Sequence, residues 1–392
     1  MYVVDVHLPW LDHLLWRKRF RVSDDSHIAK IKANGIVEVS IDTEKGIDVP
    51  EKITPPQRIN TVEQKFASLM ELKLAQPRKV SLGEERRRAA GILGQASGTV
   101  QDLMLAARVG KKVEAGLLEP VVGKMIESVM RNPDALVPLA RLKHMDAYAT
   151  EHAVATAALI IALGQQQGIS EPELERLALG ALVKDIGQAA IDARLIAKPG
   201  TLSRAEYSVV QSHVEEGLAV LEATTRLSEM SVAVVLEHHE RFDGTGYPYR
   251  MAGESISLAG RMASIVDTYD AMTSDRPYRP AISPSVALGQ LFEESERQFD
   301  PALVSAFVRT VGVFPVGTLV LLESGHLAVV DSTNPENSMA PVVRVIFHTG
   351  RQQYVSPVVV DLARKIGNHY GQIVRAESYE RWGISPLRWQ PA

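Results

Sequence analysis

Six residues of metal-binding type occur at apolar positions of predicted helices. They are four histidines and two aspartates: His152, Asp185, His213, His238, His239 and Asp267. A lone histidine on an apolar helix face is more often a core residue than a ligand, but an aspartate buried without a partner is costly. The six together favour a metal site, whose nitrogen and oxygen ligands suit Fe, Mn or Zn. From the residues alone, separate core positions remain the alternative interpretation.

Helix start and stop signals place two of these residues. Asp185 lies at the end of a helix that a capping box starts at Ser170, and Gly187 is a common helix terminator. His213 lies in the helix that follows a second capping box, which starts at Ser203. Both residues are therefore predicted to lie on short, well-delimited helices.

The other four candidate ligands also lie on predicted helices. His152 opens a helix with an apolar face, and Asp267 belongs to the apolar run that starts at 262. His238 and His239 are adjacent at the end of another helix. Burial of these apolar faces would carry the polar side chains into the interior.

The first third of the chain is predicted to hold several small parts. Residues 1–50 form an α/β module, with a strand over 35–42 and a short helix over 24–32. Residues 51–80 form a linker, because two adjacent prolines forbid regular structure there. Residues 81–133 form connecting helices.

The remainder of the chain makes the fold mainly α. Residues 134–311 are predicted to form a helical domain, with helix starts at Ser283 and Asp300, each followed by a proline. Residues 312–392 form a short, β-rich extension. Its β-type runs are 317–322, 327–330 and 342–347.

Composition limits the function classes. The chain of 392 residues contains no cysteine, which excludes disulfides and thiolate metal ligands. A net charge of −4 gives no argument for binding a nucleic-acid polymer or a membrane. The amino terminus lacks signal-peptide features, and the longest apolar helical segment, 153–163, is too short to span a bilayer. We expect a soluble, cytoplasmic protein.

Two long segments carry the most specific pattern in the sequence. Residues 238–248, HHERFDGTGYP, join two histidines to a Gly-Tyr-Pro triplet, and residues 267–279 read DTYDAMTSDRPYR. Turn chemistry accounts for 243–246 but not for the flanking histidines. The segments resemble the HD-GYP family of cyclic di-GMP phosphodiesterases, and this resemblance covers roughly 134–311. The amino-terminal module is similar to a small domain of unassigned role found before some members.

The resemblance implies an HD-type helical bundle that holds two metals. Asp185 would bridge them, and His152 and Asp267 would complete the first site with the histidine of the "HD" pair. The second site would be completed by His213, His238 and His239. Two metals ~3.5–4 Å apart can hold a hydroxide and polarise phosphoryl oxygens. The implied substrate is cyclic di-GMP, which is opened to pGpG and sometimes cut to GMP.

The resemblance also implies a set of substrate contacts. Arg276 would contact a substrate phosphate; a salt bridge with Asp270 or Asp275 is the alternative. Tyr247 would line the substrate or partner surface, unless it simply packs beside the following proline. Gly246 and Asp270 belong to the same predicted substrate-binding set.

The sequence departs from the family at the motif itself. It reads Lys184-Asp185-Ile186-Gly187-Gln188 where the family reads His-Asp-Ile-Gly-Lys. The first site would lose an imidazole and gain an ammonium with an unperturbed pKa of ~10.4, which repels a cation. Gln188 replaces a lysine that faces substrate phosphate in the family. Lys184, Asp185 and Gln188 form the predicted catalytic set.

One divalent transition metal is therefore expected, in the second site, with two as the alternative. Tyr148 stands where some members have a glutamate, so no third ion is expected. We expect the Lys184 ammonium near Asp267, where it would take over part of the missing cation's role.

Three functions stay open. The chain could be a metal-dependent cyclic di-GMP phosphodiesterase, which its set of ligands favours. It could be a degenerate domain that senses cyclic di-GMP or docks a signalling protein through the Gly-Tyr-Pro loop, which Lys184 and Gln188 favour. The third hypothesis is a helical support for the amino-terminal module.

Overall fold

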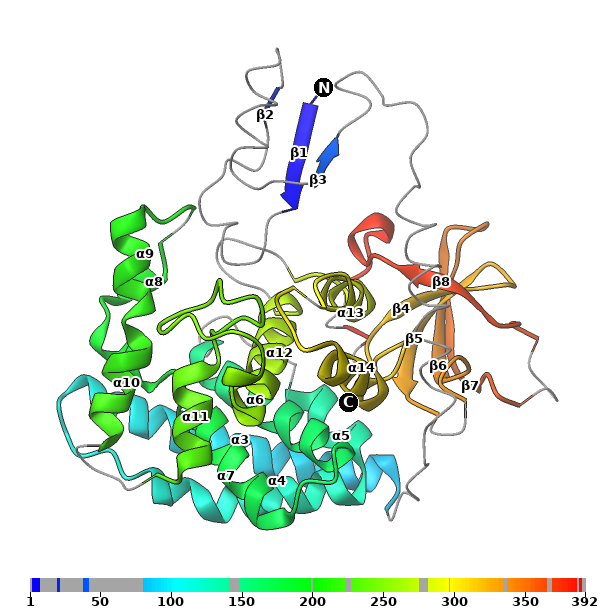
Figure 1. Ribbon diagram of the computed structural model, residues 1–392. Helices are drawn as coiled ribbons and strands as arrows, with labels where there is room; N and C mark the ends of the chain where they lie inside the picture. The colour runs from blue at the N-terminus through cyan, green and yellow to red at the C-terminus, as the bar shows by residue number, and fades with distance from the viewer. Residues whose placement is uncertain are drawn as a thin grey trace. The chain divides into compact units, whose positions relative to one another are not determined.

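The chain forms two compact units, Met1–Pro55 with Ile191–Gln211 and Pro56–Ala190 with Ser212–Ala392. Figure 1 shows the computed structural model, coloured along the chain. The structure describes residues 2–7, 20–21, 38–41, 80–140, 148–198, 200–222, 227–274, 281–295, 297–334, 337–364, 369–385 and 388–389.

The first unit contains a three-stranded antiparallel sheet. Strand β1 (Tyr2–His7) lies between β2 (Phe20–Arg21) and β3 (Glu38–Ile41). β3 lies within the strand predicted over 35–42. The helix predicted over 24–32 and most of the predicted linker lie outside the described residues.

Two short helices, α8 (Ala193–Ile196) and α9 (Arg204–Gln211), also belong to this unit. The capping box predicted at Ser203 is confirmed. The Ser203 amide donates to Glu206 Oε2 at 2.7 Å, and the Glu206 amide donates to Ser203 Oγ at 3.3 Å. These bonds satisfy two amides at the start of α9.

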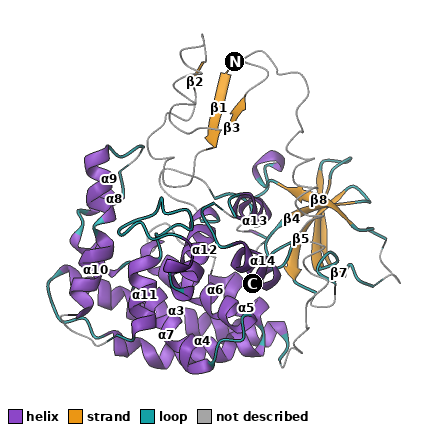
Figure 2. Cartoon of the chain, viewed as in Figure 1, coloured by secondary structure: helices purple, strands orange, loops and turns teal. Residues whose placement is uncertain are grey.

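The second unit is mainly helical up to Val311, as the purple ribbons in Figure 2 show. Within the described part of the chain, none of the helices combines the length and apolar character that crossing a bilayer demands. In chain order, its helices and 3₁₀ turns are α3 (Leu82–Arg108), η2 (Ala115–Leu118), α4 (Glu119–Arg131), α5 (Pro133–Ala140), α6 (Tyr148–Gln166), α7 (Glu171–Val183), η4 (Ile186–Ala190), α10 (His213–Glu222), α11 (Glu229–Glu237), η5 (Gly253–Ser255), α12 (Leu258–Met272), α13 (Pro284–Glu293) and α14 (Pro301–Val311).

Helix starts in this unit follow the predicted signals. Ser170 and Glu173 form the predicted capping box of α7. Ser283 Oγ accepts from an amide of α13, and Asp300 Oδ1 accepts from two amides of α14. Such local bonds satisfy amides that have no partner within their own helix.

Helix α6 lies in the core of the helical domain. All of its residues from His152 to Gly164 are buried, and it contacts α5, α7, α12 and α14. Helix α11 packs on α7 and α12 in turn. These contacts bring the elements that carry the candidate ligands into one bundle.

The chain ends in a five-stranded antiparallel sheet in the order β7-β6-β5-β4-β8. The strands are β4 (Leu319–Leu322), β5 (His326–Ser332), β6 (Val342–His348), β7 (Gln353–Asp361) and β8 (Ile373–Glu377), followed by the 3₁₀ turn η6 (Glu380–Trp382). A mainly α chain with a β-rich carboxy-terminal part is thus confirmed. Strands β7 and β8 were not among the predicted runs.

Partly buried polar contacts join this sheet to the helices. The Asp134 carboxylate at the start of α5 accepts from the Thr333 amide and hydroxyl, both at 2.9 Å. Arg86 of α3 donates to the Asp331 carbonyl at 2.7 Å. The sheet and the helical domain are therefore parts of one compact unit.

Candidate metal centre

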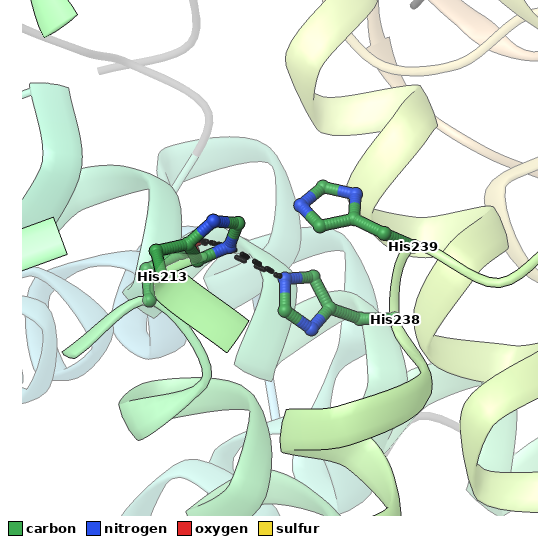
Figure 3. Close-up of side chains that lie close together, drawn as sticks. His213, His238 and His239 are labelled. Atoms are coloured by element: carbon green, nitrogen blue, oxygen red, sulfur yellow. Dashed lines mark hydrogen bonds and ion pairs between the residues drawn. The ribbon is translucent and has the colours of Figure 1, made fainter. Parts of the chain in front are cut away.

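Three imidazoles converge where α10 begins and α11 ends (Figure 3). His213 is the first residue of α10 and not, as predicted, part of the helix that starts after Ser203, because that helix, α9, ends at Gln211. His238 and His239 directly follow α11. The Nε2 atoms of His213 and His238 are 3.4 Å apart, and the His238 and His239 ring centroids are 4.1 Å apart. Three imidazoles this close can present their lone pairs to one ion.

Asp185 adds a carboxylate to this group from the turn that follows α7. Its Oδ1 lies 3.6 Å from His213 Nε2 and 3.9 Å from His238 Nε2. One ligand atom from each of Asp185, His213, His238 and His239 lies within 4.8 Å of the others. The donor set of three nitrogens and one oxygen fits a transition metal.

The protonation of His238 suits this role. Its Nδ1 lies 2.8 Å from the Val235 carbonyl, which can only accept, so Nδ1 carries the proton and Nε2 faces the cluster with its lone pair. Burial and the nearby Lys184 ammonium lower the pKa of His238 to about 3. Burial and His238 also hold the pKa of His239 well below its usual value. Neutral imidazole is the form that binds metals.

A second group of ligand atoms adjoins the first through Asp185. His152, Asp185 and Asp267 are buried, and one ligand atom from each lies within 4.8 Å of the other two. The Lys184 ammonium lies among these atoms. Its Nζ is 2.6 Å from Asp267 Oδ1 and 3.1 Å from His152 Nε2, and it donates to Asp185 Oδ2.

This second group contains a positive charge without a metal, because the Lys184 ammonium contacts both carboxylates. Burial alone would lower the pKa of Lys184, but Asp185 and Asp267 outweigh burial and raise it above its ordinary value. Burial alone would raise the pKa of both aspartates, but the Lys184 ammonium holds both pKa values well below the usual range. The ammonium is thus placed next to Asp267, where the sequence predicted it.

His152 is held in place from two sides. Its Nδ1 lies 2.5 Å from Asp270 Oδ2, and the Tyr148 ring stacks on the imidazole with centroids 5.7 Å apart. The predicted substrate contact Asp270 is therefore placed in the interior, with 0% of its surface exposed. A carboxylate in this position orients the imidazole.

Gln188 has a partner that sequence reasoning did not identify. Its Nε2 donates to Asp185 Oδ1 at 2.8 Å. Since Lys184 bonds Oδ2, each oxygen of the Asp185 carboxylate is fixed by a neighbour along the chain. The rotation of this carboxylate is set before any ion binds.

The predicted substrate contacts fall in different places. Arg276 lies in 275–280, outside the described residues. The half-buried Tyr247 ring stacks on His239 with centroids 4.6 Å apart. Gly246 is buried, and a Cβ there would lie 2.4 Å from the Arg241 amide nitrogen. Glycine at this position lets the Gly-Tyr-Pro loop press against the backbone that carries His239.

Glu240 fixes the same loop, and sequence reasoning gave it no role. Its carboxylate is buried and accepts from the Tyr249 amide at 2.7 Å and the Met251 amide at 3.0 Å. Arg250 between them has a positive φ of 55°. Burial raises the pKa of Glu240. The sequence signal was an acidic residue directly after two histidines and before a turn.

A Glu240→Gln variant is expected to lose about 1–3 kcal/mol of folding free energy, because a glutamine amide would point a donor at one of the backbone amides. Urea unfolding measures the loss. The matched control is Glu254→Gln, whose side chain is exposed and whose effect should stay within about 0.5 kcal/mol. Equal midpoints for the two variants would contradict the role assigned to Glu240.

A helical bundle with two adjoining groups of buried His and Asp side chains is consistent with the metal site of HD-type hydrolases. Residues 132–303 match the HD domain family. Residues 1–117 match a domain of unknown function, DUF3391.

Three relatives narrow this class. A cyclic di-GMP phosphodiesterase of Pseudomonas aeruginosa is 35% identical over 99% of this chain and 92% of its own length. A cyclic di-GMP phosphodiesterase response regulator of Xanthomonas campestris is 36% identical over 38% of this chain and 39% of its own. A 3′3′-cGAMP-specific phosphodiesterase of Vibrio cholerae is 32% identical over 36% of this chain and 27% of its own. The chain belongs to the HD-GYP family of cyclic di-GMP phosphodiesterases.

Proposed function

We propose that the protein hydrolyses cyclic di-GMP with one divalent transition metal held by Asp185, His213, His238 and His239. The four-ligand group carries this proposal, because it lies in a chain related over its whole length to a cyclic di-GMP phosphodiesterase. One water is consumed, a P–O3′ bond breaks, and the linear product pGpG carries the 5′ phosphate. A second cut would give GMP.

The metal would be Fe, Mn or Zn, which suit these ligands. When bound, such an ion supplies Lewis-acid activation of water and stabilises charge on the phosphoryl oxygens. The residues of the chain orient the ligands: Gln188 and Lys184 fix the Asp185 carboxylate, and Val235 fixes the His238 tautomer. Asp270 orients His152, and the Tyr247 ring packs on His239.

A His239→Ala variant is expected to bind the metal at least about 10–100-fold more weakly and to lose cyclic di-GMP hydrolysis in proportion, because it removes a direct ligand. Titration of metal-free protein with Mn²⁺, with chromatography of the nucleotides, measures both effects. The control is His369→Ala, since His369 is exposed in the carboxy-terminal extension. Full metal affinity in His239→Ala would remove His239 from the ligand set.

The second candidate function is binding of cyclic di-GMP without turnover, or docking of a signalling partner at the Gly-Tyr-Pro loop. It is favoured by the ammonium among the ligands of one metal position and by the neutral side chain of Gln188. Calorimetry with cyclic di-GMP and with 3′3′-cGAMP, followed by chromatography after long incubation, separates the two functions. Rapid formation of pGpG rejects the sensor. Tight binding with unchanged nucleotide rejects the phosphodiesterase.

A further inference from the structure

We infer that Lys184 is a built-in cation that occupies one metal position, so that the centre holds a single metal ion. The inference rests on the proposed function in one respect: it assigns the single metal ion to Asp185, His213, His238 and His239. It makes the chain a one-metal variant of a two-metal architecture.

The first support is the match between the ammonium and its surroundings. An ammonium has three N–H donors. Lys184 Nζ has three partner atoms, Asp185 Oδ2, Asp267 Oδ1 at 2.6 Å and His152 Nε2 at 3.1 Å. The residues that carry these three atoms make up the second group of potential metal ligands, His152, Asp185 and Asp267.

The second support is that the ammonium and an ion exclude each other. A metal in this group would need ligand distances of about 2.0–2.2 Å to the same three residues. Nζ already lies among these atoms, and two cations in contact at low dielectric repel strongly. The ligand set of this group therefore does not fit a metal while Lys184 is present.

The third support is that the Lys184 side chain is buried beside the two carboxylates. Lys184 directly follows the last residue of α7, next to Asp185 in the chain, and its side chain is 1% exposed. Withdrawal of the ammonium would leave Asp185 and Asp267 buried and unpaired by a cation, which is strongly unfavourable. The ammonium is thus a buried part of the fold, and it pairs with both carboxylates in metal-free protein.

The test is to count metal ions and measure thermal unfolding in wild type, Lys184→His and Lys184→Met. Each protein is loaded with excess Mn²⁺ and desalted before elemental analysis. Wild type is expected to keep one ion per chain. Lys184→His is expected to keep two, because an imidazole replaces the ammonium and three ligands become free.

Metal-free Lys184→Met is expected to unfold about 10 °C below metal-free wild type, because it leaves buried carboxylates without their cation. Excess Mn²⁺ should recover most of that loss, since the freed ligands can bind an ion. Lys198→Met is the matched control: Lys198 pairs with Glu206 near the surface, at 2.7 Å, so its loss should shift the midpoint little.

Two tightly held ions in wild type would overturn the inference, and so would an unchanged midpoint in metal-free Lys184→Met. Should Lys184→Met fail to fold, one ion in Lys184→His would overturn it alone. None of these measurements uses a nucleotide. Absence of cyclic di-GMP hydrolysis with one ion per chain would reject the proposed function and leave the one-metal centre standing.

Discussion

A Gly187→Ala variant is expected to lose about 4 kcal/mol or more of folding free energy, a large fraction of the ~5–15 kcal/mol typical of a folded protein. A Cβ at Gly187 would lie 2.0 Å from the His213 carbonyl oxygen and 2.4 Å from the Gly217 amide nitrogen. Both atoms belong to the backbone, so no side-chain rotation can relieve the clash. The turn η4 and helix α10 would have to separate.

The separation of η4 from α10 should also weaken metal binding by the four-ligand group. Gly187 lies two residues after Asp185 in η4, and the carbonyl that it would strike belongs to His213 itself. Moving α10 displaces one ligand relative to another whose side chain is only 3.6 Å away. Urea unfolding and elemental analysis of Gly187→Ala should therefore show a lower midpoint and a lost ion together.

The matched control is Gly98→Ala in the middle of α3. No atom lies within 4 Å of a Cβ built at Gly98, which is exposed. Alanine there should stabilise the protein by about 0.5–1 kcal/mol, because glycine weakens a helix interior. A Gly187→Ala midpoint as high as that of Gly98→Ala would show that η4 and α10 are not locked by close packing.

Gly187 shows which features of this chain can be predicted from its sequence and which cannot. Its position after Asp185 identified the end of a helix, which is a local property. Its close contact with α10 depends on packing between segments separated by more than twenty residues, and no spacing rule contains that information. The capping box at Ser170 was predictable for the same reason: it is formed by residues that are close together in the sequence.

The carboxy-terminal sheet shows the same limit. The three predicted runs coincide with β4, β5 and β6, which alternate or are largely buried. Strand β7 contains several valines, but Pro357 interrupts them and argues against a strand in the sequence; in the structure the strand is mostly exposed. Strand β8 is short and pairs with β4 across about 50 residues of chain. Whether such a segment forms an edge strand depends on the neighbouring strand with which it pairs, and the sequence does not show that pairing.

At the centre, residue types were predictable but their contacts were not. The six ligand-type residues lie in the two groups that the resemblance implied. The partners of Gln188 and Glu240 are set by tertiary structure. Lys184 stood out as a charged residue in a ligand position, but its bonds to His152 and Asp267 join three separate elements.

A double variant, Lys184→His with Gln188→Lys, is expected to raise the rate of cyclic di-GMP hydrolysis by about 10–100-fold or more. Loss of a residue that only hydrogen-bonds a metal ligand can already lower metal affinity or activity by that factor, and a direct ligand should matter at least as much. The imidazole would free Asp185 and Asp267 from the ammonium and add a neutral ligand. The new lysine, at a half-buried position beside Asp185, would restore a cation toward an anionic substrate. Nucleotide chromatography gives kcat/KM, and elemental analysis gives the metal content of each sample.

The two single variants separate the contributions. Lys184→His alone should raise the metal content and kcat, because a second ion stabilises charge that develops in the transition state. Gln188→Lys alone should act mainly on KM, through attraction of the substrate phosphate. Because both positions contact Asp185, their effects should not add, and the double-mutant cycle measures that coupling. An unchanged rate in a double variant that holds two ions would mean that these two residues do not limit turnover, and that the one-metal centre is already as competent as a two-metal one.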